Sequence, residues 1–421
     1  MGTLDRPTLA NTSLSLENCF QAALKRSEDL ANQEELITQT EERINQARGA
    51  ILPTLNGVAT YLTQPPPSGL TSVSPPTQST VKITGSQPLF RGFREFAALR
   101  QQKNLLEAGR STREQVVIQI FKDTLLNYYQ ILSFEKDIVN IKNQIELSEK
   151  RIRELNYFKQ LGRSRESEVL TVQATLASLE AQQEGLVSQL RSARDIFEFL
   201  TGLDRNSPLV DSELLPRKIE SVGSYIALIN NRPDVRSLTK SVEAAEEGIT
   251  IAKGAHLPSL DLIGNYYFRR PGFLSDVNWD VQVGLILPIF SGGIIQSQVR
   301  LANSVQHQNE LALSRVKRLA EQQIKQAFDI YLSDQAQFEK LKKAVNLSEK
   351  NYQAELHDYR LGLVRNLDVL QALSASQETR RAKDRMGFQL KADYLNLQAV
   401  AALRPYFAGS SQELQLKSSI D

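Results

Sequence analysis

The amino-acid sequence predicts a mainly α-helical fold with a smaller β part suited to a membrane, built as an internal tandem repeat. Three observations support this prediction. Several segments recur about 200 residues further along the chain. Long proline-free stretches carry apolar side chains at intervals of three and four, and short stretches between them alternate apolar and polar side chains. These two periods are typical of amphipathic helices and half-buried strands.

The duplication rests on matching pairs of segments. One pair is PLFRGF at residues 88–93 and PIFSGG at residues 288–293. A second pair is LSEKRIRELNYFKQLGRSRESEVL at residues 147–170 and LSEKNYQAELHDYRLGLVRNLDVL at residues 347–370, again offset by 200. A third pair, ILPTLNGVATYL from Ile51 and HLPSLDLIGNYYF from His256, is offset by 205, which places a difference in loop length between the blocks.

Each repeat is predicted to contain a helix, two strands, a very long helix, a hairpin turn and a further helix. The predicted divisions are an N-terminal extension at 1–13, repeat 1 at 14–203, an inter-repeat linker at 204–221, repeat 2 at 222–404 and a C-terminal tail at 405–421. The tail is expected to be disordered because its composition is polar and it follows the last periodic segment.

The helical segments are unusually long. Ser15 is expected to cap a helix that runs to Gly49. Residues 93–158 contain no proline, and a helix of that length would extend about 100 Å, so it needs partner helices to cover its apolar stripe. The predicted antiparallel partners are residues 165–200 and 366–403. A free-standing coiled-coil scaffold would explain these helices equally well.

The predicted strands argue against a simple scaffold. They lie at about 53–63, 79–90, 258–268 and 278–290, and each alternates apolar with polar residues. A transmembrane β-barrel requires this pattern, although ordinary half-buried strands share it. Four strands cannot close a barrel, for which about eight are the practical minimum, so several copies of the chain would have to contribute.

Aromatic residues at the strand ends favour the membrane interpretation. The loop ends of the strands carry Tyr61, Tyr266, Tyr267, Phe268, Phe273 and Trp279, and the opposite ends carry Phe90 and Phe290. Two such groups resemble the aromatic girdles at the two membrane interfaces.

The repeated PLFRGF and PIFSGG segments are predicted to join strand to helix. We expect Pro88 and Pro288 to end the strands, because proline has no N–H to donate. Phe90 and Phe290 would lie at the interface, and Gly92 and Gly292 would permit the bend into the helix.

Composition excludes several classes of function. Lys+Arg number 50 against Asp+Glu 48, so a net charge of +2 gives no reason to expect a nucleic-acid partner. The single cysteine, Cys19, cannot form an internal disulfide and is expected to be buried. No apolar signal-peptide core precedes it, so either the protein is cytoplasmic or the chain is a mature form whose export signal has been removed.

No catalytic or metal-binding pattern occurs in the sequence. His256, His307 and His357 are widely spaced, and motifs of metalloproteases, redox dithiols, serine hydrolases and phosphate-binding loops are missing. We therefore expect no enzymatic activity, no cofactor and no metal site.

Two longer motifs carry a resemblance to a known family. They are LPIFSGGIIQSQVRLA from Leu287 and YRLGLVRNLDVLQA from Tyr359. Together with the duplication, they make the chain resemble TolC-type outer-membrane efflux proteins from about Leu14 to Arg404.

The resemblance implies a homotrimer in which twelve strands form a β-barrel in the Gram-negative outer membrane and long helices form a periplasmic α-barrel. It implies a passive exit duct in a tripartite efflux or type I secretion complex. The partners would be a periplasmic adaptor (membrane fusion) protein, an inner-membrane transporter of RND, ABC or MFS type, and outer-membrane lipid. The alternative interpretations are a periplasmic adaptor and a non-channel coiled-coil scaffold.

The resemblance also implies a gate at the periplasmic end. Asp368 matches the first of two acids that form rings at the constriction, and Gln371 replaces the second. Tyr359 and Glu168 match a tyrosine and an acid that are linked in the closed state, and Arg365 stands one residue after the position of a gate arginine.

The hairpin turns are expected to contact the adaptor. The turn residues concerned are Leu161, Gly162, Arg163, Leu361, Gly362 and Leu363. Apart from the resemblance, Gly162 and Gly362 would serve as helix terminators and Asp368 as a solvated acid at a helix start.

Overall fold

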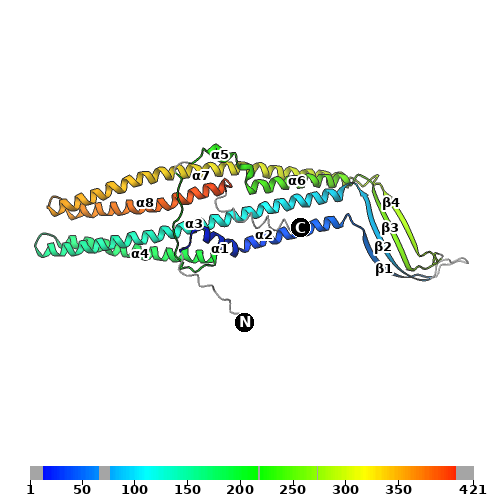
Figure 1. Cartoon of the computed structure of the whole chain (residues 1–421), viewed down its shortest axis with the longest axis horizontal. Helices are drawn as coiled ribbons and strands as arrows, with labels where there is room; N and C mark the ends of the chain where they lie inside the picture. The colour runs from blue at the N-terminus through cyan, green and yellow to red at the C-terminus, as the bar shows by residue number, and fades with distance from the viewer. Residues whose placement is uncertain (1–12, 66–75, 217–218, 273, 404–421) are drawn as a thin grey trace, which may run out of the picture. The chain divides into compact units, whose positions relative to one another are not determined.

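The structure is a computed structural model that describes residues 13–65, 76–216, 219–272 and 274–403. Phe273 and the predicted tail at 405–421 lie outside the described residues. The elements are α1 (Leu16–Arg26), α2 (Glu28–Gly49), β1 (Thr54–Thr63), β2 (Thr77–Arg91), α3 (Arg94–Gln160), α4 (Glu166–Thr201), α5 (Val222–Ile226), η1 (Ile229–Asn231), α6 (Pro233–Gly254), β3 (Ser259–Arg269), β4 (Trp279–Ile286), α7 (Ile294–Arg360) and α8 (Asn366–Val400). In Figure 1, α4 folds back along α3 and α8 folds back along α7. None of the described helices is both long and apolar enough to cross a membrane.

The chain divides into two compact units, each of which takes segments from both repeats. Unit 1 contains the described residues up to Leu30, then Gln115–Arg232 and the described residues from Leu319 onward. Unit 2 contains Ala31–Glu114 and Pro233–Arg318. Because α3 and α7 contribute residues to both units, the repeats set the order of the elements but do not form separate units.

The strands of unit 2 form one antiparallel sheet in the order β1-β2-β3-β4. One face is apolar and exposed, with Leu55 at 78%, Trp279 at 65% and Val283 at 62% exposure. On the other face, the Asn265 amide donates to the Asp280 carboxylate at 2.7 Å. The predicted alternation is confirmed, and the described residues leave the apolar face uncovered.

The first junction between strand and helix differs from the expectation that Pro88 ends the strand. β2 runs on to Arg91, and a register shift between Pro88 and Phe90 marks a bulge opposite Asp261 and Leu260. A bulge allows proline to sit in a strand without breaking the rest of the ladder. The Arg91 guanidinium then donates twice to the Asp261 carboxylate, at 2.9 and 3.1 Å, which ties β2 to β3 beside the bulge.

The second junction departs from the expectation in the opposite direction. β4 ends at Ile286, so it is shorter than the predicted 278–290, and Pro288 lies beyond the strand. The proline thus lies inside the strand in the first repeat and after the end of the strand in the second.

Both junctions nevertheless use the same backbone turn. Two successive residues have left-handed φ angles, which are 67° and 60° at Gly92 and Phe93, and 59° and 81° at Gly292 and Gly293. A long helix begins at the next residue in each repeat. The conformation is strained at Phe93, and its ring packs edge-on against Phe90 with centroids 5.1 Å apart, which offsets part of that strain.

The helix expected from Ser15 to Gly49 is two helices, α1 and α2, separated by Ser27. Ser15 caps α1 as expected, and its hydroxyl accepts from the Asn18 N–H at 3.3 Å. The Ser27 hydroxyl accepts from the Leu30 N–H at 3.2 Å and so starts a new helix. A serine that bonds to the backbone in this way competes with a continuous helix.

Unit 1 is stabilised by an apolar core where α1, α3, α4 and α8 meet. Phe20 packs edge-on against Phe121 with ring centroids 5.3 Å apart, and Phe197 and Leu395 are buried in the same cluster. Cys19 lies fully buried here, and burial raises the pKa of its thiol to about 12. The cysteine therefore acts as a small core side chain.

Buried polar contacts fix the register of α8 against α3. Asp137, with 1% exposure, forms an ion pair with Arg385. One turn away, the Asn140 amide donates to the Asp384 carboxylate at 3.0 Å. Since an unpaired buried charge is costly, these contacts disfavour sliding of one helix along the other.

The two junction glycines provide a matched pair of stability tests. A Cβ at Gly92 would lie 2.2 Å from the Gly254 carbonyl oxygen, whereas a Cβ at Gly292 meets nothing within 4 Å. Left-handed backbone costs an alanine about 1–2 kcal/mol at either site. Gly92→Ala should therefore lower the unfolding temperature clearly more than Gly292→Ala, as measured by circular dichroism in detergent. Equal shifts would contradict the predicted close approach of Gly92 and Gly254.

Candidate functional site

The candidate site lies in unit 1, at the turns between α3 and α4 and between α7 and α8. Gly162 and Gly362 have left-handed φ angles of 72° and 78°. The N–H of Arg163 reaches back to the Phe158 carbonyl at 2.8 Å, and the N–H of Leu363 reaches the Asp358 carbonyl at 3.0 Å. Both helices thus end in the same glycine-based motif, which satisfies their last carbonyl groups.

The next helices begin with an acid that caps them. The Glu168 carboxylate accepts from the Arg165 N–H at 3.4 Å, and the Asp368 carboxylate accepts from the Arg365 N–H at 2.9 Å. Negative charge in the first turn is also favoured by the helix dipole. Each acid therefore has a structural role at a helix start in this conformation.

A buried arginine joins the two hairpins. Arg151 of α3 donates from Nε and Nη2 to the Asn366 side-chain oxygen at 2.9 and 2.8 Å, and from Nη1 to Glu154 at 2.7 Å. Its guanidinium also lies 4.0 Å from the centroid of the Tyr359 ring. Arg151 is 5% and Asn366 2% exposed, so both partners of this contact are withdrawn from water.

Arg151 and Asn366 were missed by the sequence-based reasoning. The available signal is position, because Ser148, Arg151 and Leu155 follow the three-and-four spacing of the buried stripe of α3. A charged residue on a buried stripe requires a partner. The spacing of buried residues along α3 does not identify this partner, because Asn366 lies 215 residues further along the chain.

Tyr359 and Glu168 meet through a third residue. The Ser164 hydroxyl donates to the Glu168 carboxylate at 2.5 Å. Burial raises the pKa of Tyr359, the nearby Arg151 charge opposes the rise, and Ser164 lies near enough to the Tyr359 hydroxyl to lower the pKa of that tyrosine as well. The hydroxyl therefore stays protonated at neutral pH and able to donate.

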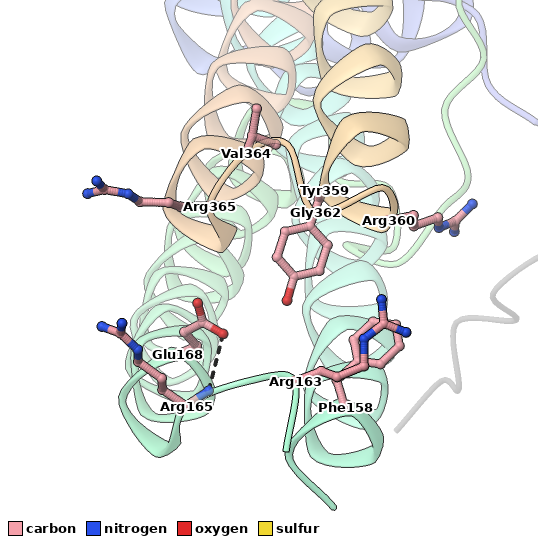
Figure 2. A pocket seen from close by; sticks show the side chains of 9 residues that line it. All are labelled: Phe158, Arg163, Arg165, Glu168, Tyr359, Arg360, Gly362, Val364 and Arg365. Carbon is pink, nitrogen blue, oxygen red and sulfur yellow. Dashed lines mark hydrogen bonds between the residues drawn. The ribbon is translucent and has the colours of Figure 1, made fainter. Parts of the chain in front are cut away.

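Among the described residues, the other expected gate residues form no hydrogen bond or ion pair with Tyr359, Ser164 or Glu168. Arg365 is exposed, and Figure 2 shows its side chain directed away from Tyr359. Asp368 is half-buried, and Gln371 is exposed further along α8. Asp368 and Gln371 do not line the space between the turns. Beneath the turns, apolar side chains of both hairpins pack together, including Leu155, Val169 and Leu370.

A pocket of about 520 Å³ opens between the two turns. It is lined by Phe158, Arg163, Arg165, Glu168, Tyr359, Arg360, Gly362, Val364 and Arg365, as Figure 2 shows. Four of these residues are arginines and one is an acid. Among the described residues, no group of three or more histidine, cysteine, aspartate or glutamate side chains could hold a metal ion.

The turns also carry exposed leucines that are not part of the pocket lining. Leu161, Leu361 and Leu363 are 53%, 61% and 71% exposed. Apolar side chains grouped at exposed turns are typical of contact surfaces. Three of the expected docking residues are therefore accessible, and two others, Arg163 and Gly362, line the pocket.

Comparisons with known proteins agree on one family. The model of the family described as outer membrane efflux protein matches residues 19–202 and again residues 225–406. The fusaric acid resistance protein FusA of Burkholderia cepacia is 25% identical over 210 residues, which make up 47% of this chain but only 38% of FusA. The alignment therefore spans well under half of that relative.

Solved structures share the fold across nearly the whole chain. The outer membrane protein VceC of Vibrio cholerae has a TM-score of 0.80 at 19% identity, covering 92% of this chain and 95% of VceC. The MtrE outer membrane channel of Neisseria gonorrhoeae, in its open state, has a TM-score of 0.75 at 19% identity, covering 93% of this chain and 89% of MtrE.

The two matches of the family model coincide with the duplication seen in the sequence, and the similarity to the solved channels extends over both repeats. A periplasmic adaptor or a coiled-coil scaffold is accordingly not favoured. The chain belongs to the outer membrane efflux protein family.

Proposed function

We propose that the chain is one protomer of a trimeric outer-membrane exit duct that conducts substrates passively. One observation carries the proposal: a four-stranded sheet with an exposed apolar face continues in sequence into helices of 67 residues. Helices of that length extend about 100 Å, which suits a passage through the periplasm.

The sheet supports a barrel made of several copies. Each of the edge strands β1 and β4 pairs with a single neighbour in the described part of the chain. Lipid cannot satisfy the unpaired N–H and C=O groups of an open edge. Three copies would supply twelve strands and pair every edge, which is enough to close a barrel.

The two faces of the sheet suit lipid on one side and water on the other. On the apolar face, Tyr61 and Phe268 near the strand ends are 75% and 65% exposed, as expected of an interfacial girdle. On the polar face, Lys82 and Thr84 both donate to the Asn265 side-chain oxygen, at 2.9 and 2.8 Å. A polar network across strands suits the wall of a water-filled lumen.

The contacts between the hairpins support a gate. If the periplasmic end opens by separation of the hairpins, the contact between Arg151 and Asn366 and the link from Tyr359 through Ser164 to Glu168 have to break. The buried position of Arg151 makes this costly, because its guanidinium would lose Asn366 and the Tyr359 ring and keep only Glu154 of its own helix. The ring of Asp368 carboxylates expected in a trimer is part of the same proposal.

The turns are proposed to receive a periplasmic adaptor, which would connect the duct to an inner-membrane transporter. The support is the accessibility of Leu161, Leu361 and Leu363 at the end of both hairpins. In such a complex the transporter supplies the energy, and the duct supplies only a path.

The proposal as a whole is tested by conductance. Purified protein reconstituted in a planar lipid bilayer should insert and give a stable ionic conductance, because the closed barrel would enclose water. Cross-linking in detergent should give a trimer. A monomer that remains in aqueous solution and gives no conductance would contradict the proposed function.

A second prediction concerns the tie between the hairpins. Arg151→Gln removes a charged hydrogen-bonding group whose contacts are worth about 1.5–3 kcal/mol, so the open fraction should rise roughly 10- to 100-fold. Single-channel recording measures this fraction directly. The control is Arg153→Gln, because Arg153 is 66% exposed in its side chain and its ion pair is with Glu149 on the same helix, at 3.9 Å. Equal behaviour of the two variants would exclude Arg151 from gating.

A third prediction concerns Asp368. Asp368→Asn keeps an oxygen that can accept from the Arg365 N–H, so the start of α8 should persist while the negative charge is lost. If the carboxylates of three protomers face one constriction, the variant should weaken block by divalent cations several-fold. The same block in variant and parent would remove Asp368 from the proposed gate.

A further inference from the structure

The polar face of the sheet carries a network of side chains that joins β2, β3 and β4. At its centre, the Asn265 side-chain oxygen accepts from Lys82 and Thr84, at 2.9 and 2.8 Å, and the Asn265 amide donates to the Asp280 carboxylate at 2.7 Å. The asparagine thus uses its oxygen for the cation and its nitrogen for the acid. Lys82 is bonded to a neutral group, and among the described residues it forms no ion pair.

Tyr267 holds a second cation beside Lys82. The Arg270 guanidinium lies 4.2 Å and the Lys82 ammonium 5.5 Å from the centroid of the Tyr267 ring, whose face attracts cations. Arg270 also pairs with Asp280 at 3.4 Å and donates to the Val277 carbonyl at 3.3 Å. Two cations therefore share one ring and one acid near the start of β4.

A bulge in β3 determines which of two adjacent arginines joins this network. The register of β2 on β3 shifts so that Val81 pairs with Arg269, whereas Lys82 pairs with Tyr267. Residues that pair across strands share a face of the sheet, so Arg269 lies on the apolar face with Val81. The contacts of Arg270 with Tyr267 and Asp280 place it on the polar face.

The charges of the polar face do not cancel. Within the strands and their contacts, the charged side chains of this face are Lys82, Arg91, Asp261, Arg270 and Asp280. Arg91 and Asp261 neutralise each other as an ion pair at 2.9 Å. Lys82 and Arg270 then stand against Asp280 alone, which leaves an excess of positive charge at the loop end of the sheet. Asp276 lies beyond the strands in the exposed turn and forms no ion pair with the described residues.

We propose that Lys82 and Arg270 form a positive ring on the inner wall of the duct that favours the passage of anions. The inference rests on the proposed function, because the polar face lines a lumen only in a closed barrel. Three copies would repeat the excess of positive charge around that lumen, where it attracts anions and repels cations. This preference is opposite in sign to that expected of the Asp368 carboxylates, so mutation can separate the two.

The test measures the reversal potential of the full chain in a planar lipid bilayer. The KCl gradient runs from about 0.01 to 0.1 M, where the Debye length is roughly 30 to 10 Å. K82Q/R270Q leaves Asp280 without cations on this face, so the chloride-to-potassium permeability ratio should fall about threefold or more. With about 1 M KCl or more on both sides, the Debye length is about 3 Å, and most of the difference between variant and parent should disappear.

Arg269 supplies the matched control. R269Q removes one positive charge from the neighbouring residue but on the opposite face of β3, so it should keep the permeability ratio of the parent. K82R/R270K retains both charges and should keep the ratio too, which separates the charge from the shape of the side chains. The single variant K82Q leaves the contacts of Arg270 in place and should give a smaller fall in the ratio, even if the double variant does not insert.

Three results would overturn the proposal. They are an unchanged ratio at low salt in K82Q or K82Q/R270Q, a fall in R269Q as large as that in K82Q/R270Q, and an equal fall in K82R/R270K. If the parent conducts and these variants keep its selectivity, the duct stands and the ring is excluded. A parent that gives no conductance contradicts the duct itself, and the ring with it.

Discussion

Backbone hydrogen bonding at the edges of the sheet is the constraint on which the rest of the structure depends. β1 and β4 each have one neighbour among the described strands, and the face that carries Leu55 and Val283 is exposed. An open edge and an apolar face are each unfavourable, the first in lipid and the second in water. Further strands would satisfy the edges, and lipid would cover the apolar face. Both conditions are met if several copies of the chain close one barrel in a membrane, as proposed above.

The duplication shows which features of each repeat are fixed by geometry. The strand-to-helix junctions share two left-handed residues, although Phe93 stands where the second repeat has Gly293. The hairpin turns share the terminating glycine and an acid that caps the next helix. The pocket, in contrast, depends on Arg163 and Phe158, whose counterparts 200 residues later are leucine and aspartate. Both repeats therefore keep the same backbone turns, whereas the pocket lining requires different side chains from the two hairpins together.

Sequence reasoning succeeded where the signal is local. Alternation predicted both faces of the sheet, and the three-and-four spacing predicted the long helices, because neighbouring residues decide both patterns. The helix break at Ser27 depends on a side-chain hydrogen bond that competes with the backbone bonds of a continuous helix. The bulge at Pro88 depends on how β2 pairs with β3, and the sequence is compatible with more than one register of that pairing. The contact of Arg151 with Asn366 joins segments 215 residues apart, and the bridging role of Ser164 requires both turns to be in place. No single-sequence pattern contains that information.

The acidic residues near the hairpin turns each have a structural partner. Glu154 pairs with the buried Arg151, while Glu168 and Asp368 accept from the backbone at the starts of α4 and α8. These carboxylates stabilise the hairpins, and of the three only Glu154 also pairs with an arginine of the turns, Arg360, at 3.8 Å. The pocket lining in an almost neutral chain therefore contains four arginines and one acid, and that acid already accepts hydrogen bonds from Ser164 and Arg165. Among the described residues, Arg360 thus pairs with Glu154 at 3.8 Å, whereas the ion pairs do not include Arg163, Arg165 or Arg365.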